Sequence, residues 1–190
     1  IDTFVLQVET LQGGDRSLYL RTAVRSQRSA NGLSNLIKAA EHVSRDQLIS
    51  FLATADTLGR TRESIKANEL NNLISTIAQS PQWTDDLIQT ALGLSEENRG
   101  LFLEAAQGAK EELGGLIKSV QRVSTSQINL FLETAIEAGK GLANLINLTQ
   151  DTTGQTQSHL LAFANSLDGE DTENFLLATQ GDRENMAGLM

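Results

Sequence analysis

The sequence predicts an all-α protein built as an array of helical hairpins, similar to an α-solenoid. Apolar residues return at the helical spacing i, i+3, i+4 and i+7 in one segment after another. The chain contains a single proline, Pro81, and a proline inside a helix costs about 3 kcal/mol. Whole segments also resemble one another at offsets of roughly 73–83 residues, which is the signature of a repeat protein.

One predicted helix type, which we call F-type, carries phenylalanine on its apolar face. It opens with Ser44 and Gln47, whose spacing is that of a capping box, in which the two side chains satisfy free N–H groups at the helix start. The same pattern begins again further along the chain, at Ser124 and Gln127. The apolar faces are Leu48, Phe51, Leu52 and Ala55 in the first copy, and Ile128, Phe131, Leu132 and Ala135 in the second.

A second predicted helix type, which we call L-type, contains Asn-Leu-Ile or Gly-Leu-Ile. Copies begin at Asn35, Asn72, Gly115 and Asn144. The longest match in the chain pairs residues 87–117 with 160–190 at a constant offset of 73, without gaps. We therefore expect units of five helices, in which a short lead helix precedes an F-type, an L-type, a second F-type and a second L-type helix.

This order gives about 12 to 13 short helices, with a period of roughly 73–83 residues. The first unit, residues 1–80, has predicted helices at 3–11, 15–26, 31–42, 45–57 and 63–79. The second, residues 81–151, has them at 85–93, 96–107, 110–122, 125–137 and 140–149. A partial third unit, residues 152–190, has them at 155–166, 171–180 and 183–190.

The array is expected to continue beyond residue 190, because the last residues match a point at which the second unit goes on. Helix links of a few residues allow either stacked hairpins or a closed multi-helix bundle, and the fixed period favours the stack. The arrangement resembles α-solenoid repeats as a class, although the tetratricopeptide and ankyrin signatures are absent from the sequence.

Charge and composition restrict the partners. Residues 1–80 hold 9 Lys or Arg against 8 Asp or Glu, whereas residues 81–190 hold 6 against 16, a balance of −10. Such an acidic half argues against nucleic acid as a partner. No apolar run approaches the roughly 18 residues of a membrane span, so we expect no membrane insertion. The cysteine-free, aromatic-poor composition favours a secreted or cell-surface bacterial protein over a cytoplasmic one, without deciding the compartment.

The sequence contains no recognisable catalytic constellation, so we expect no enzyme, no cofactor and no metal site. His42 and His159 have no motif neighbours, and Gly139-Lys140-Gly141 lacks the rest of a phosphate loop. The acidic stretch 168–173 is interpreted as the start of a helix, where carboxylates are favoured. Adventitious binding of a divalent cation is the alternative.

A group of arginines is the one candidate site. Arg21, Arg25 and Arg28 have helical spacing i, i+4 and i+7, and Arg16 is nearby. The first interpretation is a solvated face or ion pairs to an acidic neighbour; the alternative, which would make the four arginines a site, is a docking patch for an acidic protein partner. Because the second half of the chain is acidic, another copy of the chain is a possible partner.

The function predicted from these features is a protein-interaction or scaffold module within a larger protein. The alternative is a structural building block of a self-assembling filament, appendage or cell-surface layer. The size of the particle in solution distinguishes the two, because a module stays monomeric whereas a building block forms ordered polymers.

Overall fold

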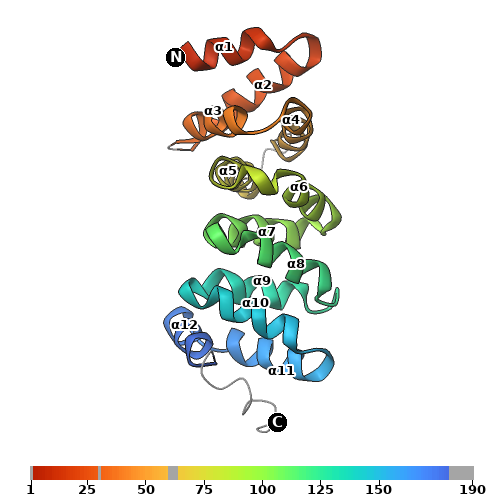
Figure 1. The fold of residues 1–190 in the computed structure, drawn as a ribbon, viewed down its shortest axis with the longest axis vertical. Helices are drawn as coiled ribbons and strands as arrows, with labels where there is room; N and C mark the ends of the chain where they lie inside the picture. Colours follow the sequence, from red (N-terminus) through yellow and green to blue (C-terminus); the bar gives the residue numbers. More distant parts are fainter. Residues whose placement is uncertain (1, 30, 60–63, 180–190) are drawn as a thin grey trace. The chain divides into compact units, whose positions relative to one another are not determined.

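Every regular element in the described part of the chain is a helix (Figure 1). The computed structural model describes residues 2–29, 31–59 and 64–179, and no strand occurs among them. The all-α prediction is confirmed. The predicted helix 183–190 lies outside the described residues.

The chain forms two compact units, Ile1–Lys110 and Glu111–Met190. The first contains α1 (Asp2–Thr10), α2 (Gly13–Ser26), α3 (Gly32–His42), α4 (Arg45–Gly59), α5 (Ser64–Gln79), the 3₁₀ turn η1 (Pro81–Trp83), α6 (Thr84–Gly93) and α7 (Glu96–Ala109). After the 3₁₀ turn η2 (Lys110–Glu112), the second contains α8 (Leu113–Arg122), α9 (Ile128–Glu137), η3 (Gly139–Gly141), α10 (Leu142–Asp151), α11 (Gly154–Asn165) and α12 (Gly169–Ala178).

Within the first unit, helices two places apart in the sequence pack against each other (Figure 1). One layer is α3, α5 and α7, and the other is α2, α4 and α6. Phe51, the phenylalanine of the first F-type copy, is fully buried on α4, and so is Phe102 on α7. The apolar stripe of each helix therefore faces its neighbours, as the periodicity predicts.

In the second unit, too, helices two places apart in the sequence pack against each other. Helices α8, α10 and α12 pack in one series, and α9 packs on α11. Phe131 on α9 is fully buried, and Leu116 and Leu176 are buried on α8 and α12. The same kind of core therefore serves both units, with leucine, isoleucine and alanine supplying most of it.

Three predicted helix starts are confirmed by hydrogen bonds. Gln47 Oε1 accepts from the Ser44 N–H at 3.0 Å, and Ser44 Oγ accepts from the Gln47 N–H at 3.3 Å, so the capping box is complete. Ser95 Oγ accepts from the Asn98 N–H. Asp168 Oδ1 accepts from the Asp171 N–H at 3.3 Å, so the acidic stretch 168–173 does begin a helix.

The predicted capping box at Ser124 is wrong. The Gln127 N–H donates to the Ser124 carbonyl oxygen at 2.8 Å and so closes a turn. The Ser124 hydroxyl donates instead to Gln127 Oε1 at 2.9 Å. Because this turn replaces the first helical turn, α9 begins at Ile128 rather than at residue 125.

Two L-type helices also begin later than predicted, because 3₁₀ turns precede them at η2 and η3. Each turn starts on a residue with positive φ: Lys110 has φ 47° and ψ −110°, and Gly139 has φ 49°. Glycine adopts such angles without steric cost, whereas a lysine there is strained. Lys110 is the one described non-glycine residue with positive φ.

Replacing Lys110 by glycine is expected to stabilise the protein. Lys110→Gly should raise the free energy of unfolding by about 1 kcal/mol, because it relieves the backbone strain. Lys110→Ala is the matched control, since it removes the same side chain and keeps the strain. Urea denaturation followed by circular dichroism measures both, and equal effects of the two substitutions would contradict this interpretation.

Tyr19, the single tyrosine of the chain, fixes α1 against α2 and α3. It is fully buried and stacks on Phe4, with ring centroids 5.6 Å apart. Its hydroxyl donates to Gln7 Oε1, and Gln7 Nε2 donates to the Ile37 carbonyl oxygen at 3.0 Å. Burial raises the pKa of the Tyr19 hydroxyl, and the Glu41 carboxylate raises it further.

Stability is therefore expected to fall in alkaline solution. An unfolded tyrosine loses its proton at a pH of about 10, whereas folded Tyr19 keeps it to higher pH, so the free energy of unfolding decreases as pH rises above that value. Tyr19→Phe should lack this part of the decrease. Denaturant midpoints of both proteins across this range test the prediction, which fails if their pH dependences coincide.

Candidate interaction surfaces

The four arginines of the predicted patch have different surroundings. Arg16 lies against the end of α1, where its Nε donates to the carbonyl oxygens of Val8 and Leu11 at 3.1 and 2.9 Å. Carbonyl groups at the end of a helix have no partner within it, so Arg16 caps α1. Arg16 therefore binds backbone carbonyl groups near the α1–α2 link. The other three arginines, Arg21, Arg25 and Arg28, line one hollow.

Asp56 on α4 holds two of these three arginines. Its side chain is only 3% exposed, and its Oδ1 accepts from Arg21 Nε at 3.2 Å and from Arg25 Nη1 at 2.8 Å. Arg25 Nη1 also donates to the Asp56 carbonyl oxygen. A buried carboxylate requires such partners. The ion-pair interpretation therefore applies to Arg21 and Arg25, and it fixes where both side chains lie.

The outer face of α2 combines these arginines with exposed apolar side chains. Leu20 is 40% exposed and Val24 is 68% exposed. Together with Arg21, Arg25 and Arg28 they line a shallow hollow of about 390 Å³. No hydrogen bond or ion pair joins the Arg28 side chain to another residue that the structure describes. We call these five residues the α2 face.

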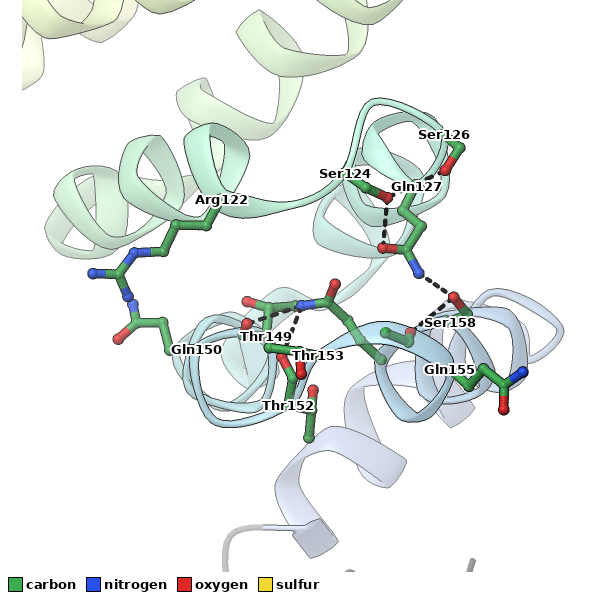
Figure 2. Close-up of a pocket in the computed structure, with 12 residues that line it drawn as sticks. Arg122, Ser124, Ser126, Gln127, Thr149, Gln150, Thr152, Thr153, Gln155 and Ser158 are labelled. Atoms are coloured by element: carbon green, nitrogen blue, oxygen red, sulfur yellow. Dashed lines mark hydrogen bonds between the residues drawn. The ribbon is translucent and has the colours of Figure 1, made fainter.

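A second hollow, of about 570 Å³, lies within the second unit where four segments meet (Figure 2). These are the end of α8 at Arg122, the turn before α9, the end of α10 and the start of α11. All twelve lining residues are polar or glycine: Arg122, Ser124, Ser126, Gln127, Thr149, Gln150, Thr152, Thr153, Gly154, Gln155, Gln157 and Ser158. We call this site the polar hollow.

One wall of the polar hollow is fixed by hydrogen bonds. Figure 2 shows Gln127 between Ser124 and Ser158, with its Nε2 donating to the Ser158 hydroxyl. The Thr149 and Thr152 hydroxyls donate back to the α10 backbone at 2.8 and 2.6 Å. Figure 2 places Arg122 and Gln150 on the other side. The shape of this hollow is thus set by contacts within the protein.

No helix in the described part of the chain is both long and apolar enough to cross a membrane. In residues 2–29, 31–59 and 64–179, no three His, Cys, Asp or Glu side chains are grouped so that they could hold a metal ion. Neither protein-family models, nor curated proteins, nor solved structures give a match to this chain.

The arginines of the α2 face could be found from the sequence, but their apolar companions were missed. Leu20 and Val24 have the same helical spacing as Arg21, Arg25 and Arg28, so a search for apolar residues between cationic ones would have found them. The polar hollow was missed altogether. The sequence indicates it only by the polar stretch from Thr149 to Ser158, which consists of threonine, glutamine and serine apart from Asp151 and Gly154.

Removing the Asp56 charge tests its role in positioning the arginines. Asp56→Asn is expected to lower the free energy of unfolding by about 2 kcal/mol, because two guanidinium groups lose a buried carboxylate. Asp46→Asn, an exposed change in the first turn of the same helix, should cost no more than about 0.5 kcal/mol. Chemical denaturation measures both. Equal losses would show that Asp56 is not the anchor.

Proposed function

We propose that the chain is a non-enzymatic helical-repeat protein that acts as a protein-interaction module. The observation that carries the proposal is the α2 face, where Leu20 and Val24 are exposed between arginines. Exposed apolar side chains within a charged rim are typical of surfaces that bind other proteins.

The repeat part of this proposal is supported by a contact that occurs twice. In the first unit Gln47 Nε2 donates to Asp85 Oδ2 at 3.0 Å, and in the second Gln127 Nε2 donates to the Ser158 hydroxyl. The two glutamines occupy the same place in the two copies of the F-type pattern, and their two partners are also separated by one period of the sequence repeat. The layered packing of helices two places apart favours stacked hairpins over a closed bundle.

The partner that fits the α2 face is an amphipathic helix with carboxylates beside its apolar residues. Leu20 and Val24 supply an apolar strip one helical turn long, and Arg28 lies beside it with a guanidinium that pairs with no residue in the described part of the chain. Arg21 and Arg25 are already held by Asp56, so less side-chain entropy is lost on binding. Helix-in-groove recognition of this kind uses anchors at i and i+4.

Binding of synthetic peptides tests the docking surface. A fluorescent amphipathic helix with leucines on one face and glutamates beside them should bind, and its affinity should fall as salt is added. The same peptide with lysines in place of the glutamates should bind more weakly. Fluorescence anisotropy measures both, and equal binding of the two peptides would contradict the assignment.

Val24→Glu should weaken binding of the glutamate peptide about tenfold, because it removes apolar contact and places a negative charge opposite the glutamates. Leu92→Glu is the matched control, since Leu92 is an exposed apolar residue on α6 outside the α2 face. If both substitutions weaken binding equally, the α2 face is not the docking site.

The second candidate is a structural building block of a filament, appendage or cell-surface layer. The charge difference between residues 1–80 and 81–190 favours it, because a cationic face on one copy can meet an acidic face on another. Sedimentation velocity over a wide range of concentrations distinguishes the two candidates. Ordered polymers that dissociate on charge reversal of Arg28 would support the building block, and a persistent monomer would support the module.

A further inference from the structure

Gln157, one of the residues that line the polar hollow, has a side-chain oxygen, Oε1, that no hydrogen bond in the described part of the chain uses. Gln157 is only 6% exposed, and its Nε2 donates to the carbonyl oxygens of Thr149 and Thr152 at 2.9 and 3.2 Å. These two bonds fix the orientation of the planar amide. An acceptor held in this way is suited to a ligand that brings an N–H or O–H group.

The rim of the hollow offers the complementary groups. Arg122, Gln150 and Gln155 are exposed and line it, and no hydrogen bond or ion pair to another described residue uses their side chains. The second unit carries 11 Asp or Glu against 4 Lys or Arg over residues 111–190, yet none of these carboxylates belongs to the lining. Arg122 is therefore the charged side chain of the lining, and the group that complements a guanidinium is a carboxylate.

We infer that the polar hollow binds an extended, acidic segment of polypeptide. A peptide group presents an N–H and a carbonyl oxygen together, which matches the Gln157 acceptor and the donors of Gln150 and Gln155. An acidic side chain of the segment pairs with Arg122. A simple anion would gain nothing from Gln157 Oε1, which repels it.

The size and composition of the hollow agree with such an occupant. Its volume of about 570 Å³ lies within the range of ligand sites, roughly 300–1,000 Å³. The lining contains no aromatic residue on which a sugar ring could stack. The site lies on α8 to α11 and shares no residue with the α2 face, so the two proposals succeed or fail separately.

The experiment is a nuclear magnetic resonance titration of the whole ¹⁵N-labelled chain with capped tripeptides. Acetyl-Thr-Glu-Thr-amide should shift the signals of Gln155, Gln157 and the backbone near residues 122 and 149–158. Acetyl-Thr-Lys-Thr-amide should bind about three to five times more weakly. Methylation of the glutamate amide nitrogen removes the N–H that Gln157 would accept, and should weaken binding about threefold to tenfold without any change in the protein.

Charge reversal at the rim tests whether the acidic side chain of the peptide pairs with Arg122. Arg122→Glu should reverse the preference, so that the lysine peptide binds better than the glutamate peptide. Lys118→Glu is the matched control, because it makes the same charge change one turn earlier on the exposed side of α8, outside the lining. The control should keep the preference for glutamate.

Three results would overturn the inference. One is the absence of shifts near the hollow with either peptide. Another is an unchanged preference in Arg122→Glu, or a reversal in Lys118→Glu as well. The third is localised binding of the neutral trisaccharide maltotriose without binding of the glutamate peptide, which would assign the hollow to a carbohydrate.

Discussion

The structure depends on one constraint: most of its described helices are too short to be stable alone. Described helices run from 9 residues in α1 to 16 in α5, and isolated helices below about 12–15 residues are marginal in water. Their stability must come from burial of an apolar stripe against other helices. Packing between helices two places apart in each unit provides this burial, so every element depends on its neighbours in the layers.

The two units stabilise one such helix pair in different ways. In the first, Glu69 on α5 accepts from Arg99 on α7 at 3.1 Å, and the Glu69 side chain is only 3% exposed. In the proposed repeat, these two positions correspond to Gly141 and Thr172 in the second unit. A Cβ atom on Gly141 would lie 2.7 Å from the Leu176 Cβ, so glycine allows the close approach there. A buried ion pair thus joins α5 to α7, whereas a close glycine contact joins η3 to α12.

Short-range periodicity predicted most helices and their buried faces, because an apolar stripe depends on residues within two or three turns. Contacts between distant residues could not be predicted in this way. Ser44 and Ser124 begin the same sequence pattern, yet only Ser44 caps its helix, and the glutamines of the two patterns bind different partners, Asp85 and Ser158. The polar hollow was missed for the same reason, since four segments build it.

At both proposed surfaces, hydrogen bonds to buried polar groups hold the side chains that a partner would contact. Asp56 holds Arg21 and Arg25 beside Leu20 and Val24, and two carbonyl oxygens hold the Gln157 amide in the polar hollow. In each case folding, rather than binding, orders the side chain, so the protein loses less side-chain entropy when a partner binds. The same buried groups that align neighbouring helices therefore prepare the surfaces for recognition, and a substitution such as Asp56→Asn should weaken docking at the α2 face as well as the fold.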